Sequence, residues 1–209
     1  MAGWGYRKHH VRIRDRQIIV SHAELHYRRL TRSIFRQIIK KHHDVIYIVV
    51  GATHPHLKAE QGEDYRLGLH MLAKQLGVDD HVIFHDRFIS EEELPEFIGA
   101  ADIYITPYLN EAQIVSGTLA YALGMGKAVV STPYWHAQEL LDDGRGRLFP
   151  FRNQQQLGRE INDLLSHPDK LRSIQLKAYK YGRKMIWREV GRGYLETFAN
   201  ARQHRLRNT

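Results

Sequence analysis

Residues 102–131 form a strand–loop–helix–strand pattern, and this pattern limits the chain to a small set of folds. The apolar runs at 103–105 and 128–130 predict two short buried strands. Between them, a polar loop leads into a helix that is expected to begin at Ser116 and to end at a pair of glycines. The pattern indicates one unit of an α/β sheet, in which strands and helices alternate.

The expected helix opens with Ser116, Gly117 and Thr118. The first N–H groups of a helix have no partner within the helix and lie at the positive end of its dipole, so that they and two hydroxyls suit a phosphate. A serine here is also consistent with a plain N-cap. The preceding loop favours a ligand, because Glu111 and Gln113 bring polar groups to the carboxyl end of a strand, where open α/β sheets bind their ligands.

Strands and helices alternate along most of the chain. Apolar runs and helical periodicity predict strands at 17–20, 45–50, 82–84 and 148–149, and helices at 23–41, 63–76, 90–99, 137–141, 153–165, 168–182 and 186–205. Ser90 and Glu93 have the spacing of a capping box. The alternation predicts a Rossmann-like α/β fold, with a parallel sheet covered by helices on both faces. Right-handed crossovers then bring the loops that follow residues 51, 84 and 106 to one edge of the sheet.

The composition excludes several classes of protein. The chain has no cysteine, which removes disulfides, thiolate zinc sites and cysteine nucleophiles. No apolar run approaches the roughly 20 residues of a membrane span, and the first residues lack the apolar core of a signal peptide. We therefore expect a cytoplasmic protein. His54 and His56 have no third partner, so no metal site is expected.

The net charge is +8, and the excess of basic residues lies toward the two ends of the sequence. Residues 1–16 follow neither period and are expected to form a loose basic arm before one domain over 17–209. Basic residues are also frequent in 7–41 and from Lys170 onward, which is consistent with solvated faces. A nucleic-acid-binding module is the alternative, but the aromatic residues are not interleaved with the basic ones as in a strand platform. No nucleic-acid partner is expected.

Five segments, read in order, carry a resemblance to a known family: 45–55, 76–84, 98–108, 123–131 and 139–149. They resemble the C-terminal, nucleotide-sugar-binding domain of retaining GT-B glycosyltransferases, family 4 (glycosyl transferases group 1). The likeness covers residues 35–198, and it rests on the order and spacing of the segments rather than on any one of them. It implies one half of a GT-B fold, which holds a nucleotide diphosphate sugar against an N-terminal acceptor domain.

The resemblance also implies roles for individual residues. Ser116, Gly117 and Thr118 would face the diphosphate of the donor, and the backbone around Arg87 and Phe88 would face its nucleobase. The family's reaction is transfer of a sugar, here of the hexosyl type, with retention at the anomeric carbon. The family needs no cofactor or metal for this, and the acceptor would be a glycan, a lipid or a small molecule. Peripheral contact with a membrane is compatible with this expectation.

The chain departs from the family at two glutamates that are eight positions apart, because their places are taken by Gln113 and Tyr121. By resemblance, Gln113 would contact the donor sugar, with Glu111 as a stand-in two residues upstream, and these two are the candidate catalytic residues. Tyr121 would offer the ribose one hydroxyl where a carboxylate accepts two bonds.

The start of the sequence departs further. Residues 18–29 contain neither the glycine nor the Lys-Gly that the family has there, and the acceptor domain has no counterpart. Two interpretations stay open: a fragment of a longer enzyme, or a chain whose first 30 or so residues are not ancestral. A catalytically silent remnant that serves binding or oligomerisation is the alternative function.

Overall fold

A single parallel sheet forms the centre of the molecule. The structure, a computed structural model, describes residues 16–22, 34–52, 59 and 62–207. Within these residues, six parallel strands lie in the order β3-β2-β1-β4-β5-β6. They are β1 (Gln17–His22), β2 (Val45–Val50), β3 (Val82–His85), β4 (Ile103–Thr106), β5 (Ala128–Ser131) and β6 (Gly146–Leu148). This order is that of a Rossmann-like sheet, whose direction of growth reverses between β1 and β4. The fold predicted from the alternation of elements is confirmed.

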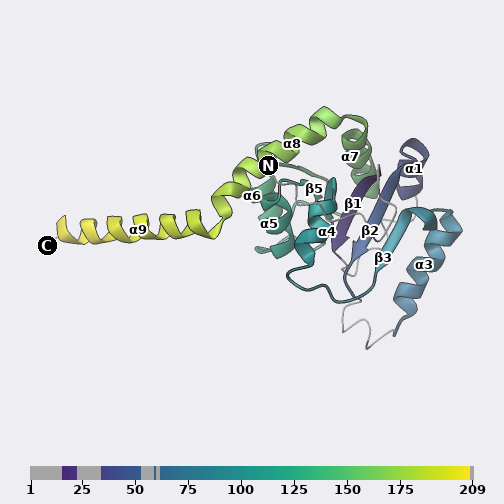
Figure 1. The fold of residues 1–209 in the computed structure, drawn as a ribbon, viewed down its shortest axis with the longest axis horizontal. Helices are drawn as coiled ribbons and strands as arrows, with labels where there is room; N and C mark the ends of the chain where they lie inside the picture. Colours follow the sequence, from purple (N-terminus) through teal and green to yellow (C-terminus); the bar gives the residue numbers. More distant parts are fainter. Residues whose placement is uncertain (1–15, 23–33, 53–58, 60–61, 208–209) are drawn as a thin grey trace.

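Helices cover both faces of the sheet (Figure 1). One apolar core joins it to α1 (Ile34–Lys41), α3 (Asp64–Leu76) and α7 (Gln154–Ser166), and the other joins it to α4 (Leu94–Ala100), α5 (Gly117–Gly124) and α6 (Trp135–Leu141). The next helix, α8 (Pro168–Gly182), contributes Ile174 to the first core and Ala178 to the second. All six side chains of β2 are buried, which explains why its sequence is an unbroken apolar run.

The local signals at the helix ends are confirmed where the structure describes them. Gly77 ends α3 with a left-handed backbone, at a φ of 63°. Ser90 and Glu93 form the reciprocal hydrogen bonds of the expected capping box, in which the backbone N–H of each donates to a side-chain oxygen of the other at 3.3 Å. The helix itself, predicted from residue 90, begins only at Leu94, after a turn over 91–93. Of the helix predicted over 23–41, the structure shows the part in α1, and the remainder lies outside the described residues, as do His54, His56 and the arm before residue 16.

The prediction for the last strand was wrong by two residues. We expected it at 148–149, whereas β6 pairs Gly146 with Val129 and ends at Leu148. A Cβ on Gly146 would lie 2.7 Å from the side chain of Leu141 in α6 and 3.0 Å from the carbonyl oxygen of Val129 in β5, so the absence of a side chain lets this strand pair closely with β5. Of the two apolar residues that suggested the strand, Leu148 is exposed, and Phe149 is buried but lies beyond the end of β6. Backbone pairing, rather than apolar burial, therefore sets the limits of β6.

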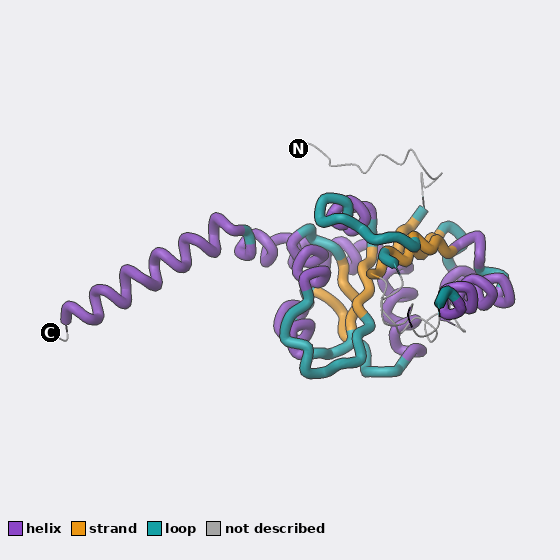
Figure 2. The backbone as a smooth tube through the Cα atoms, turned by 90° about the horizontal axis from the view of Figure 1, so that it is seen from below, coloured by secondary structure: helices purple, strands orange, loops and turns teal. Residues whose placement is uncertain are grey.

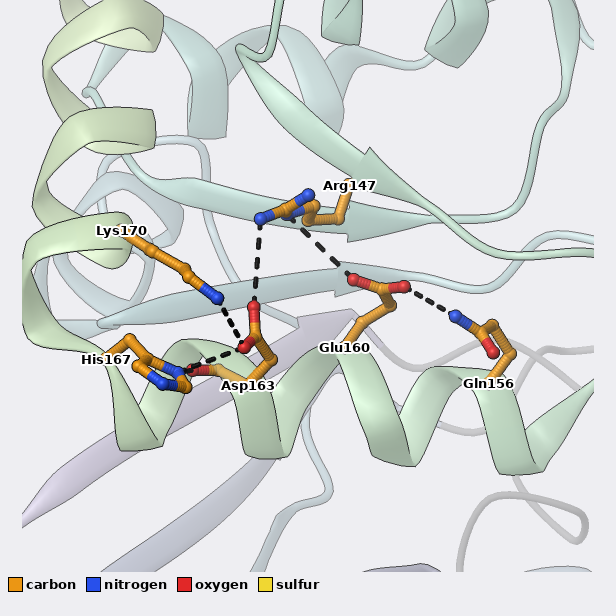
Figure 3. Close-up of polar contacts among 6 residues, drawn as sticks. All are labelled: Arg147, Gln156, Glu160, Asp163, His167 and Lys170. Carbon is orange, nitrogen blue, oxygen red and sulfur yellow. Dashed lines mark hydrogen bonds and ion pairs between the residues drawn. The ribbon is translucent and has the colours of Figure 1, made fainter.

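A polar cluster ties β6 to the two helices that follow it (Figure 3). Asp163 of α7 accepts hydrogen bonds from Lys170 at 2.8 Å and lies 3.0 Å from Nδ1 of His167. Arg147 of β6 lies 3.8 Å from Asp163 and 3.9 Å from Glu160. The groups are partly exposed, so each pair adds little stability on its own. Together they fix the turn between α7 and α8 against the edge of the sheet.

The last helix leaves the body of the molecule. After α8, α9 (Trp187–Arg207) extends away from the sheet and its covering helices (Figures 1 and 2). Its apolar positions Trp187, Tyr194, Leu195 and Phe198 are exposed. No helix in the described part of the chain combines the length and apolar character that a membrane crossing requires.

Candidate functional site

The loop between β4 and α5 leaves the sheet where its order reverses, which is where open α/β sheets bind ligands. The register pairs His22 with Val50 and Val50 with His85, so the strands β1 to β3 end level with one another. The loops after β3 and β4 therefore leave the same edge, as the sequence predicts. Two strands lie between them, which corresponds to about 14 Å at the usual strand spacing.

Buried polar groups form a platform under this loop. Thr106 donates from Oγ1 to Oγ of Ser131 at 2.8 Å, and the N–H of Thr132 donates to the carbonyl of Thr106 at 3.3 Å. The hydroxyl of Thr132 donates to the carbonyl of Tyr108. Because paired polar groups in a buried network hold each other in place, the first residues of the loop have a fixed path.

The N-terminus of α6 holds the middle of the loop. The backbone N–H of Trp135 donates to the carbonyl of Glu111 at 3.0 Å, and that of His136 donates to the carbonyl of Gln113 at 3.2 Å. These are N–H groups that a helix start leaves without partners in the helix itself. The sequence predicted this helix from residue 137; it begins at Trp135 because the loop supplies the carbonyl acceptors.

Ser116 is the N-cap of α5, so the capping interpretation of this residue is confirmed. Its Oγ accepts the N–H of Leu119 at 3.3 Å, and its own backbone N–H donates to Nδ1 of His136 at 2.9 Å. The expected cluster of three free amides therefore needs a correction, since the Ser116 amide is already used. Within the described part of the chain, the N–H groups of Gly117 and Thr118 have no acceptor.

The start of α5 is open to a ligand. Gly117 is exposed, and a Cβ added to it would meet nothing within 4 Å. The hydroxyl of Thr118 lies 3.3 Å from that of Tyr108 and 3.5 Å from Oγ of Ser116. Two free amides and a hydroxyl thus converge at the positive end of a helix, which is the arrangement that binds phosphate groups.

The predicted sugar-contacting residues lie in the same continuous segment. Glu111 is exposed, and among the described residues its carboxylate has no hydrogen-bond partner. Gln113 is half-buried and donates from Nε2 to the carbonyl of Val115 at 3.1 Å, which leaves its side-chain oxygen as an acceptor. Tyr121 is 46% exposed and lies four residues after Gly117, on the same side of α5.

Arg87 and Phe88 lie in the loop after β3, and their side chains differ in how accessible they are to a ligand. The guanidinium of Arg87 pairs with both carboxylate oxygens of Glu93, with one contact at 2.8 Å, and this lowers the pKa of Glu93 to about 2. Phe88 is 83% exposed. The loop leads into α4, which packs against α5 and β1. The structure thus brings this loop to the edge that carries the Ser116 segment, with the ring of Phe88 open and the charge of Arg87 engaged.

His136 is the residue that the sequence did not single out. Its Nδ1 accepts a hydrogen bond and therefore carries no proton, and burial lowers the pKa of the imidazole, against the smaller opposing effect of Glu139. No spacing rule marks this histidine, because its importance comes from contact with a segment 20 residues earlier.

Neither a metal site nor an apolar cavity in the described part of the chain is an alternative ligand site. Among the described residues, no group of three or more His, Asp or Glu side chains is arranged to hold a metal ion. An apolar cavity of about 20 Å³ lies in the core between the sheet and helices α1 and α7, lined by residues that include Phe35, Tyr47 and Leu157. Its lining offers almost no polar group, so it is a packing gap in the core.

Comparison with known families gives one match. The family described as Glycosyl transferases group 1 matches residues 18–167. No curated protein matches the sequence.

Solved structures with the same fold include the C-terminal domain of LpcC, a glycosyl transferase group 1 family protein from Francisella tularensis. It is 22% identical, with a TM-score of 0.64 over 79% of this chain and 83% of that one. HepE from Anabaena in complex with UDP is 19% identical, with a TM-score of 0.74 over 92% of this chain and 51% of that one. HepE has also been solved with UDP-glucose.

WaaG, a glycosyltransferase involved in lipopolysaccharide biosynthesis, is 22% identical, with a TM-score of 0.61 over 82% of this chain and 44% of that one. The chain therefore spans about half the length of HepE and somewhat less of WaaG.

Proposed function

The chain belongs to the glycosyl transferases of group 1, and from that premise we propose that it binds a nucleotide diphosphate sugar at the carboxyl edge of its sheet. The observation that carries the proposal is the pair of free amides at Gly117 and Thr118, beside the hydroxyl of Thr118, where the order of the strands reverses. The complexes of HepE with UDP and UDP-glucose support the choice of ligand, since HepE has the same fold.

The diphosphate is the part of the donor that this arrangement suits best. The amides of Gly117 and Thr118 donate to its oxygens, and the hydroxyl of Thr118 adds a third donor. As the bond to the sugar breaks, negative charge grows on the departing diphosphate, and amides that are already oriented stabilise it without rearrangement. The helix dipole acts in the same direction. We propose that these groups replace a metal ion.

The sugar and the ribose of the donor contact the β4–α5 segment, and the nucleobase contacts the loop after β3. Glu111 and Gln113 provide oxygen acceptors for hydroxyls of the sugar, and Tyr121 provides one hydroxyl to the ribose. The nucleobase lies against the backbone at Arg87 and Phe88, where the exposed ring of Phe88 adds a surface for stacking. The ion pair with Glu93 keeps Arg87 in place, so that it shapes the loop rather than neutralising the phosphates.

The reaction that we propose is retaining transfer of a hexosyl group, as in family 4. An acceptor domain completes the active site, because the chain spans about half of the full-length glycosyltransferases that it resembles. The isolated chain therefore binds the donor and transfers little or no sugar. The acceptor is a glycan, a lipid or a small molecule.

Calorimetric titration tests the proposal directly. The chain is titrated with UDP-glucose, GDP-mannose and ADP-glucose, and with nucleoside monophosphates as controls that lack the diphosphate. We expect saturable binding of at least one nucleotide sugar and much weaker binding of its monophosphate. Equal affinity for the two, or no binding of any nucleotide sugar, contradicts the proposal. Full turnover by the isolated chain contradicts the need for an acceptor domain.

A further inference from the structure

His136 makes two connections to the segment that precedes α5. Its backbone N–H donates to the carbonyl of Gln113, and its ring nitrogen Nδ1 accepts the N–H of Ser116. These bonds grip the segment just before the free amides of Gly117 and Thr118. The side-chain bond spans 20 residues of sequence, so it fixes the position of one helix start against another.

The side-chain bond has no replacement in the surroundings. Ser116 is 5% exposed, and its hydroxyl is already committed to the N–H of Leu119. If Nδ1 of His136 no longer accepts, the Ser116 amide is left buried and unpaired, which a folded chain avoids by moving the segment. Because Ser116 caps α5, such a movement shifts the amide of Gly117, which is the next residue.

We propose that His136 is a positioning residue of the donor site: its unprotonated Nδ1 holds the Ser116 amide, and through it the Gly117 and Thr118 amides, in the geometry that receives the diphosphate. The inference rests on the proposed function. His136 touches no reacting atom in this account. It acts through the N-cap of α5, and the site is formed while the imidazole is neutral.

Protonation of His136 at low pH therefore disrupts the donor site. A protonated imidazole carries a proton on Nδ1 and repels the Ser116 amide instead of accepting from it. The titratable and charged groups on the elements packed around His136 are Glu139 on α6, Glu111 on the loop, Tyr121 on α5 and Arg147 on β6. Burial outweighs the carboxylate of Glu139, so the pKa of His136 lies below its ordinary value and the neutral form prevails at neutral pH.

Two variants of His136 with side chains of nearly equal shape test whether the hydrogen-bond acceptor, and not the imidazole ring itself, is required. In His136→Asn, the side-chain oxygen stands where Nδ1 stood, and it accepts at any pH in the physiological range. In His136→Leu, a side chain of similar shape has no acceptor. His42→Asn is the matched control, since burial lowers the pKa of His42 too, yet it lies just before β2, at the opposite edge of the sheet.

The first measurement needs no ligand. Hydrogen exchange of the Ser116 amide is followed by NMR in the wild type and in both His136 variants at pH 8 and pH 5.5. We expect protection in the wild type at pH 8 and in His136→Asn at both values, and loss of protection in His136→Leu. Protection that is equal in all variants at both values overturns the inference.

The second measurement is calorimetric affinity for the nucleotide sugar that the wild type binds best, whose diphosphate diester does not titrate in this range. Loss of one hydrogen bond makes His136→Leu about fivefold weaker at pH 8. The wild type and His42→Asn bind more weakly as the pH falls through the lowered pKa of His136, whereas His136→Asn keeps its affinity. Binding that His136→Leu leaves unchanged contradicts this inference alone. Absence of binding by the wild type contradicts the proposed function, and the role of His136 in donor binding with it.

Discussion

Gly182, the last residue of α8, packs directly on Gly124, the last residue of α5. A Cβ added to Gly182 would lie 2.6 Å from the Cα of Gly124 and 3.0 Å from the carbonyl oxygen of Leu123. Both neighbours are backbone atoms, which cannot turn aside as a flexible side chain does. This contact fixes the far end of the helix whose start carries the proposed donor site, so that α5 is held at both ends.

Replacement of Gly182 by alanine is therefore expected to destabilise the fold by about 2 kcal/mol, the usual cost of overpacking a close contact. Urea unfolding followed by circular dichroism measures this. Gly193→Ala is the control, because a Cβ at that position in α9 meets nothing within 4 Å. Equal stability of the two variants would show that α8 and α5 are not in close contact.

Acidification is expected to destabilise the fold in a first step below pH 6.5. Burial is the largest cause of a lowered pKa in His42, His70, His85 and His136. The unfolded chain then binds more protons than the folded one, so the stability that these groups contribute is complete above their ordinary pKa of about 6.5 and falls as the pH drops through it. Urea midpoints at pH 7.5 and pH 5.5 test the sign, and a midpoint that rises on acidification contradicts it.

The hydroxyl of Tyr121 is expected to contact the ribose of the donor. Tyr121→Phe then weakens binding of the preferred nucleoside diphosphate about fivefold, as for the loss of one hydrogen bond. The 2′,3′-dideoxy form of the same nucleotide is the control, because it lacks the hydroxyls and should bind both proteins alike. A similar loss with both ligands would place Tyr121 away from the ribose.

The fold could be predicted from the sequence because its strands and helices are marked locally. The run at Val45–Val50 is apolar throughout and is buried on both faces, and Ser90 with Glu93 forms the predicted capping box, although α4 begins only at Leu94. β6 was placed wrongly because a strand held by backbone pairing beside Gly146 leaves no apolar pattern.

The candidate site was predicted in part. Ser116 to Thr118 could be recognised, since a polar loop before a helix start is visible in the sequence. The hydrogen bond of the Ser116 amide could not be predicted, because its acceptor, His136, is brought to it by the β5–α6 connection rather than by sequence spacing. The engagement of Arg87 by Glu93 depends in the same way on how one loop folds back on the next helix.

The free amide of Gly117 is expected to bind the diphosphate, and one pair of variants tests this. Gly117→Pro removes that N–H with little strain on the backbone, because proline suits the first residue of a helix and Ser116 already has the extended backbone that precedes a proline, with φ −140° and ψ 106°. Gly117→Ala adds a side chain in open space and keeps the N–H.

Calorimetric titration with the preferred nucleotide sugar gives the decisive comparison. We predict that Gly117→Pro, folded to the same extent, binds at least about tenfold more weakly than the wild type, the effect of losing a hydrogen bond to a charged group, and that Gly117→Ala, which keeps the N–H, binds more tightly than Gly117→Pro. Wild-type affinity in Gly117→Pro would contradict the account.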